Sequence, residues 1–328
     1  MHIFKDTHFD FLRWRWHAVA LSWIVILAGA AVIFTRGIPL GIEFAGGTSV
    51  IAQFDQPVSI DSVRDALSAN YQGGGQDAVI NTFGDPASNQ VMVRVPQVGA
   101  EAGQSLSTTA QSVEQALRKG NIGNFSVVGT EIVGPAVGEE LTEKGLSAFV
   151  LSLLAILAYI AFRFQFSFAL GAVVATLHDV LVTLAFLAFV QYDITLNVIA
   201  AILTVTGYST NDTIVIFDRV RENMRFSRGK SLRDIINIAL NQTLGRTVIT
   251  AGTAFLSALA LYIWGGDVLR GFAFTMLVGI VTGTYSSVFV AAAIVTFWNR
   301  KRARTVAETV PAAESARRSK AQRKAKAS

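Results

Sequence analysis

The chain contains long apolar runs and one long segment of mixed composition, and this pattern predicts most of its architecture. The apolar runs span residues 16–35, 145–162, 166–190, 194–217, 247–264 and 272–298. Each has at least about 17 residues, the minimum for a helix that crosses the roughly 30 Å hydrocarbon core of a bilayer. The pattern therefore predicts an α-helical polytopic membrane protein with six transmembrane helices.

A cleavable signal peptide is the alternative interpretation of the first apolar run. A signal peptide has a shorter apolar region, of about 7–15 residues, followed by small residues at a cleavage site. Here the apolar run is longer and no such site precedes Arg36. We therefore expect an uncleaved first transmembrane helix at 16–35, preceded by a short N-terminal segment at 1–15.

Basic residues mark the connections that we expect in the cytoplasm. Six Lys or Arg residues lie between Asp218 and Asp234, and a basic tail begins directly after Trp298. The positive-inside rule places both segments in the cytoplasm. Six helices with both termini in the cytoplasm satisfy these assignments. Residues 36–144 then lie on the periplasmic side, and helices two to six occupy 145–298.

Residues 36–144 have the periodicity of a small α+β domain. Alternating apolar positions predict strands at 48–54, 78–83, 91–95 and 125–133, and a helical period predicts helices at 60–69 and 105–119. The order βαββαβ is that of a ferredoxin-like domain, an antiparallel sheet with two helices on one face. Because no catalytic cluster is visible in it, we expect a binding or mechanical module and no enzyme activity.

Composition supports the membrane assignment. Hydrophobic residues make up 52% and charged residues 16% of the chain, which leaves little polar surface for a soluble domain. The formal net charge is +5, but membrane topology and membrane lipid explain the basic residues better than nucleic acid does. The tail at 299–328 lacks periodic apolar residues and is expected to be disordered. The absence of cysteine excludes disulfides and thiolate metal sites.

One carboxylate, Asp212, lies well inside the fourth apolar run. At about 1.5 Å per residue it is roughly 7–8 Å from the cytoplasmic end of that run. An ionisable residue is costly within a membrane and is usually functional. Tyr208, Ser209 and Asn211 lie close to it on the same helix and offer hydrogen bonds or room for water. We predict that Asp212 binds a proton.

Arg246, at the start of the fifth run, is the predicted partner of Asp212. The two residues lie at similar depth. Because arginine keeps its charge at physiological pH, Arg246 would control the proton on Asp212 without carrying one. A static structural ion pair is the alternative interpretation.

The third run contains a second polar pair, His178 and Asp179. A metal site is not expected there, because the other three histidines lie within the first 17 residues and a metal usually needs three or four ligands. Two interpretations stay open for the pair. It either forms hydrogen bonds between helices or supports a proton path.

Two further patterns concern helix packing. Ser231-Leu-Arg-Asp234 matches a capping box and precedes a helical apolar face, which predicts a short amphipathic helix at the cytoplasmic surface. In the last run, small residues recur every four positions, at Gly271, Thr275, Gly279, Gly283 and Ser287. This seam permits close approach of another helix, in the same chain or in a partner.

Six motifs occur in a fixed order along the chain. They are GIEFAGGT at 41–48, TLHDV at 176–180, TGYSTNDTIVIFDRVREN at 206–223, Arg246-Thr247, WGGDVLRGFAF at 264–274 and GTYSSVFVA at 283–291. Together they resemble the SecF family, the smaller membrane subunits of the bacterial SecDF protein-export complex. Glu43 and Thr210 are mild departures, since aspartate and an aliphatic residue are expected at these positions.

The resemblance implies one half of an RND-type transporter in the bacterial inner membrane. Such a subunit pairs with SecD, associates with the SecYEG channel and YajC, and uses the proton-motive force to draw preproteins outward. No cofactor is implied. Asp212 and Arg246 fall on the family's proton-transport positions, where an aspartate of SecD is expected to join them. A passive scaffold for SecD and the channel, or an RND-type small-molecule efflux half, are the alternatives.

Overall fold

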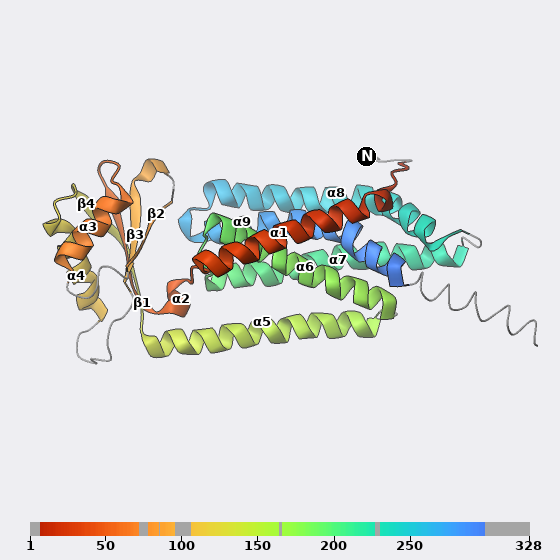
Figure 1. Ribbon diagram of the computed structural model, residues 1–328, viewed down its shortest axis with the longest axis horizontal. Helices are drawn as coiled ribbons and strands as arrows, with labels where there is room; N and C mark the ends of the chain where they lie inside the picture. Colours follow the sequence, from red (N-terminus) through yellow and green to blue (C-terminus); the bar gives the residue numbers. More distant parts are fainter. Residues whose placement is uncertain are drawn as a thin grey trace, which may run out of the picture.

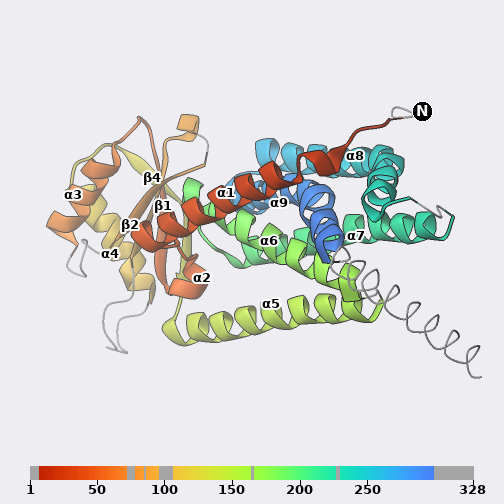
Figure 2. The same ribbon diagram turned by 45° about the vertical axis from the view of Figure 1, so that its right-hand side comes forward.

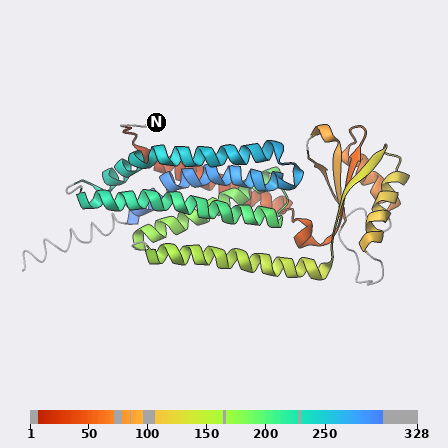
Figure 3. The ribbon, with the colours of Figure 1, turned by 180° about the vertical axis from the view of Figure 1, so that it is seen from behind.

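The computed structural model describes residues 7–71, 78–84, 86–95, 106–163, 166–226 and 230–298. The tail at 299–328, with its predicted disorder, lies outside the described residues. A bundle of long helices occupies one end of the molecule and a small α/β domain the other (Figure 1). The same separation is seen from behind (Figure 3).

The bundle is built from six long helices, of which those from α5 onward follow one another with short connections. They are α1 (Arg15–Arg36), α5 (Pro135–Arg163), α6 (Phe166–Val190), α7 (Leu196–Phe226), α8 (Leu232–Trp264) and α9 (Asp267–Ser286). After α9 the chain passes through a π-helical turn, η4 (Ser287–Ala291), and stays helical to residue 298. Helix α5 lies along one side of the bundle (Figures 1 and 3).

Within the described residues, five helices are long and apolar enough to cross a membrane: α1, α5, α6, α8 and α9 with its continuation. The chain is therefore a membrane protein, as predicted. Helix α7 is not among these five, because the polar residues from Thr204 to Thr213 lower its hydropathy. The count of six transmembrane helices thus stays a prediction.

The predicted amphipathic helix is not a separate element. It forms the first turns of α8, which then changes direction (Figure 2). Ser231 caps it as expected, because its Oγ accepts a hydrogen bond from the Asp234 backbone N–H at 3.2 Å. The apolar side is buried in the main core beside Phe217, at Ile235, Ile236, Ala239 and Leu240. The apolar side of these first turns therefore packs inside the bundle.

The α/β domain lies between α1 and α5 in the sequence. Its strands are β1 (Gly47–Phe54), β2 (Val79–Phe83), β3 (Gln90–Val95) and β4 (Phe125–Val133), and its helices are α3 (Ile60–Asn70) and α4 (Leu106–Lys119), with a short turn, η3 (Pro86–Ser88), before β3. The described sheet has the order β2-β3-β1-β4 with antiparallel neighbours. Both helices cover the sheet face that points away from the bundle (Figures 1 and 3). The other face is turned towards the bundle.

A short helix, α2 (Ile42–Ala45), connects α1 to β1. It ends at two glycines, Gly46 and Gly47, whose φ angles are +68° and +110°. Side chains other than glycine rarely adopt these angles. The glycine pair therefore allows the sharp change from helix to strand at the entrance of the domain.

The small-residue seam of the last run packs against α7 of the same chain. A Cβ atom on Gly283 would lie 2.7 Å from Cβ of Ser209, and one on Gly279 would overlap the side chain of Val205. Ser287, at the end of the seam, contacts Asp212. Of the two interpretations left open by the sequence, packing within one chain is the one that the structure shows.

Replacing Gly279 by alanine is expected to destabilise the bundle, because the new methyl group must displace Val205 in a packed helix interface. Overpacking of this kind usually costs about 1–3 kcal/mol. Thermal unfolding of the detergent-solubilised protein measures the loss. Gly252→Ala on α8 is the matched control, since nothing lies within 4 Å of its added Cβ. Equal stability of the two variants would contradict the packing described for α7 and α9.

Candidate functional site

Asp212 lies where three helices of the bundle meet. Its residue is 8% exposed, although it is on α7, the most polar of the long helices. One carboxylate oxygen, Oδ1, accepts a hydrogen bond from Thr247 Oγ1 of α8 at 2.8 Å. The other, Oδ2, accepts one from Ser287 Oγ at 2.8 Å. Asp212 is therefore desolvated but held by two neutral hydroxyl donors.

Ser287 is the first residue of the π-helical turn that follows α9. Single π-helical turns inside longer helices are rare and often occur at functional sites. In the sequence, Ser287 stands out only as a small residue of the packing seam. Its fourfold spacing from Gly283 was the available signal, but the spacing alone did not reveal which carboxylate the hydroxyl would meet.

The structure does not form the predicted ion pair between Asp212 and Arg246. Among the described residues, Arg246 makes no ion pair, and its side chain is exposed on the outer face of α8. Neighbouring residues on an α-helix point in directions about 100° apart, as 3.6 residues per turn requires. Because Thr247 faces Asp212, Arg246 must point elsewhere. The role of Arg246 in controlling a proton on Asp212 therefore stays a prediction, and the two side chains are not paired in this structure.

Arg246 belongs to a polar surface shared by α7 and α8. We call it the polar face. Its exposed residues are Thr204, Gly207 and Asn211 of α7 and Arg246, Thr250 and Thr253 of α8. Tyr208 is partly buried behind this face, close to Thr250. Polar groups within a membrane need protein partners or water, so this face is unsuited to contact with lipid tails.

Asp179 forms a second buried carboxylate site on α6 and is 1% exposed. Its Oδ2 accepts a hydrogen bond from Ser209 Oγ of α7 at 2.5 Å. Its Oδ1 lies 3.0 Å from His178 Nδ1, and the His178 ring stacks on Tyr285 of α9 at 6.4 Å. The pair thus connects α6 with α7 and α9, which agrees with the interpretation that it forms contacts between helices.

The two carboxylate sites are linked through α7. Ser209, which we grouped with Asp212 from the sequence, instead contacts Asp179. It lies three residues before Asp212, less than one turn away on the same helix. A single turn of α7 therefore joins the two carboxylate sites. Within the described residues, there is no cluster of three or more side chains that could hold a metal ion.

Comparisons with known proteins agree with this architecture. The model of the protein export membrane protein SecD/SecF C-terminal family matches residues 112–301, and that of the SecD/SecF GG motif matches residues 31–58. The chain is 42% identical to protein translocase subunit SecF of Desulfurispirillum indicum over 89% of this chain and 92% of that protein. The chain belongs to the SecF family of protein translocase subunits. The resemblance inferred from the motifs is thereby confirmed.

Other SecF relatives are similar over nearly their whole length. SecF of Escherichia coli O157:H7 is 38% identical over 90% of this chain and 89% of that protein. The crystal structure of SecDF from Thermus thermophilus, described as a translocon-associated membrane protein, aligns with a TM-score of 0.80 and 34% identity over 90% of this chain. The alignment covers only 39% of that longer SecDF chain.

Proposed function

We propose that this SecF chain pairs with SecD in the bacterial inner membrane and uses the proton-motive force to promote preprotein export through the SecYEG channel, with YajC as a further associate. Its similarity to only 39% of the SecDF chain supports the need for a second subunit. The observation that carries the proposal is the burial of Asp212 at the junction of α7, α8 and η4, behind a polar face.

We infer that α7 also spans the membrane, which brings the number of transmembrane helices to six, and that both termini lie in the cytoplasm. Support comes from its length of 31 residues and from its packing against α6, α8 and α9, which are all apolar enough to span. A polar span is tolerated when its polar groups face protein. The α/β domain is then periplasmic. Its element order and its sheet order β2-β3-β1-β4 support a ferredoxin-like fold.

In the proposed mechanism, Asp212 takes up and releases the proton. Protonation removes the charge that Thr247 and Ser287 stabilise, and the junction of the three helices rearranges. Arg246 acts from the polar face, where a carboxylate of SecD is its expected partner. Each proton that crosses 100 mV supplies about 2.3 kcal/mol. That is enough to shift a two-state equilibrium by more than tenfold.

His178 and Asp179 have a supporting role in this proposal. Asp179 holds Ser209, and Ser209 lies on the same turn of α7 as Asp212. Tyr208 and Asn211 lie on the side of α7 that belongs to the polar face or borders it. Together these residues set the position of α7 relative to α6 and to the expected partner.

Export into inverted membrane vesicles tests the proposal. Vesicles with this chain and its SecD are expected to export a preprotein faster when a proton gradient is present at constant ATP, and a protonophore should remove the gain. Vesicles without the pair are the control. An equal gradient effect in both would indicate a passive scaffold. Drug sensitivity without a secretion defect in cells that lack the chain would indicate an efflux function.

A further inference from the structure

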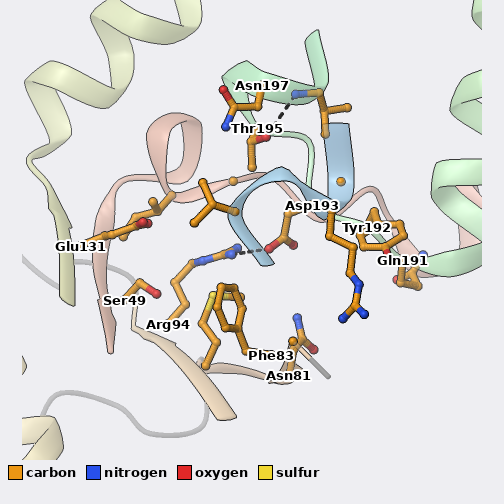
Figure 4. Close-up of a pocket in the computed structure, with 18 of the residues that line it drawn as sticks. Ser49, Asn81, Phe83, Arg94, Glu131, Gln191, Tyr192, Asp193, Thr195 and Asn197 are labelled. Atoms are coloured by element: carbon orange, nitrogen blue, oxygen red, sulfur yellow. Dashed lines mark hydrogen bonds and ion pairs between the residues drawn. The ribbon is translucent and has the colours of Figure 1, made fainter. Parts of the chain in front are cut away.

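The sheet of the α/β domain places one buried arginine opposite the helix bundle. Arg94 lies on β3, and its register partners on the neighbouring strands are Ser49 of β1 and Val79 of β2. Ser49 in turn pairs with Glu131 of β4. Because helices α3 and α4 cover the other face, Arg94 points from the middle of the sheet towards the bundle (Figure 4). It is nevertheless only 6% exposed.

Arg94 is buried because it contacts two connections of the bundle. Its Nη2 donates to Asp193 Oδ2 at 2.5 Å, and its Nη1 donates to the backbone carbonyl of Leu40 at 2.6 Å. Asp193 lies in the loop between α6 and α7, and Leu40 lies in the segment between α1 and α2. One guanidinium group therefore joins the sheet to both connections.

The same two connections also pair with each other through their backbones. Leu40 and Ile194 form an isolated parallel β-bridge. The Gly41 N–H donates to the Ile194 carbonyl at 2.7 Å, and the Ile194 N–H donates to the Pro39 carbonyl at 2.8 Å. A Cβ atom on Gly41 would lie 2.9 Å from that Ile194 carbonyl oxygen. Glycine is thus required for the close approach.

Polar groups gather beside this contact. A cavity of about 470 Å³ lies between the sheet and the bundle, and it is lined by Glu43, Ser49, Arg94 and Asp193 together with Asn81 and Glu131. Several buried polar atoms around it have no hydrogen-bond partner among the described residues: Glu43 Oε2, Ser49 Oγ, Arg94 Nε and Asp193 Oδ1. A cavity of this size with several unpaired polar atoms suits water. The ion pair and the bridge are therefore the links that tie the sheet and the α1–α2 segment to the loop between α6 and α7.

We propose that the Arg94–Asp193 ion pair and the Leu40–Ile194 bridge form a rigid joint that carries movement of α6 and α7 to the α/β domain. The inference rests on the proposed function. Asp179 is on α6 and Asp212 is on α7, so the loop that holds Asp193 connects the two helices that bear the buried carboxylates. Arg94 and Asp193 are positioning residues in this scheme and bind no proton of the transport cycle.

The joint transmits movement because its parts cannot separate cheaply. Removing one partner of a buried ion pair leaves an uncompensated buried charge. Because the guanidinium donates to two acceptors, it fixes the orientation of the sheet relative to the two connections in addition to their distance. When the outer ends of α6 and α7 shift, the sheet must follow them.

Asp193→Asn tests the joint. We expect gradient-dependent export to fall at least about fivefold, the lower end of typical coupling between distant sites, while ATP-driven export and co-purification with SecD are retained. Glu114→Gln is the control, because it removes an exposed ion pair with Arg118 in the same domain and such pairs contribute little. Arg94→Lys, which keeps the charge but loses the two-pronged contact, is the second variant should Asp193→Asn fail to assemble.

A covalent replacement of the joint gives the decisive measurement. The chain has no cysteine, so Leu40→Cys with Ile194→Cys forms a unique disulfide. Adjacent strands lie about 4.8 Å apart, within the range of Cα distances that a disulfide needs. In the Asp193→Asn chain, oxidation is expected to restore gradient-dependent export and reduction to remove it again. In the otherwise unchanged chain, the oxidised pair should export normally.

Three results would overturn the joint: full gradient-dependent export by Asp193→Asn and Arg94→Lys, no restoration by the disulfide, or a block of export by the disulfide in the otherwise unchanged chain. The last would mean that the bridge has to open. Asp212→Asn separates the two levels of inference. If Asp212→Asn keeps the gradient-dependent export, the proposed function is wrong. If Asp212→Asn loses this export while Asp193→Asn and Arg94→Lys keep it, only the proposed joint is wrong.

Discussion

Replacing Asp212 by asparagine is expected to abolish the gradient-dependent part of preprotein export and to leave assembly with SecD intact. Asparagine has nearly the same size and its carbonyl oxygen still accepts a hydrogen bond, so the junction of α7, α8 and η4 stays packed. It cannot exchange a proton, and it carries no charge that a proton could neutralise. Export into inverted vesicles, with and without a gradient and at matched levels of the complex, measures the loss.

Asp218→Asn is the matched control for this experiment. Asp218 lies on the same helix, but its side chain is 48% exposed and 3.6 Å from Arg221. An exposed carboxylate of this kind contributes little to stability and has no place in the proton path. We expect wild-type export from it. A full gradient effect in Asp212→Asn would show that Asp212 is a structural polar residue and that energy coupling resides in the partner subunit.

Arg246→Met is expected to cause a similar loss of gradient-dependent export for a different reason. Its side chain is exposed on the polar face and makes no ion pair among the residues that the structure describes. The variant should therefore unfold at the same temperature as the wild type when this chain is purified alone. In the complex it removes the cation that faces the expected carboxylate of SecD, so export loses its response to the gradient.

Arg246→Lys distinguishes charge from geometry at this position. Lysine retains the positive charge but lacks the planar fork that binds carboxylates in two-pronged fashion. We expect partial gradient-dependent export from it, between those of the wild type and Arg246→Met. Wild-type export by Arg246→Met would instead place the controlling cation elsewhere. A lower unfolding temperature of the isolated Arg246→Met chain would point to a structural role within this subunit.

Much of the fold could be predicted from periodicity. The strands and helices of the α/β domain lie close to their predicted bounds, because a half-buried sheet and its covering helices impose alternation and helical spacing on the sequence. The runs at 16–35 and 166–190 likewise match α1 and α6. Helix ends were less predictable. Helices α5 and α7 extend beyond their apolar parts, since a helix continues into water where a partner helix or domain supports it.

The sequence by itself determined that this is a membrane protein, that its domain has the order βαββαβ, and that Asp212 is buried, because hydrophobic pattern and the cost of a charge in a membrane are local properties. Only the tertiary structure decided which groups meet. In the folded chain, Thr247 and Ser287 face Asp212, and Arg246 lies on the polar face. Arg94 pairs with Asp193, which is 99 positions away in the sequence. Such contacts depend on the rotation of each helix and on the path of each loop. A shift of one residue along a helix turns its side chains by about 100° and changes these contacts.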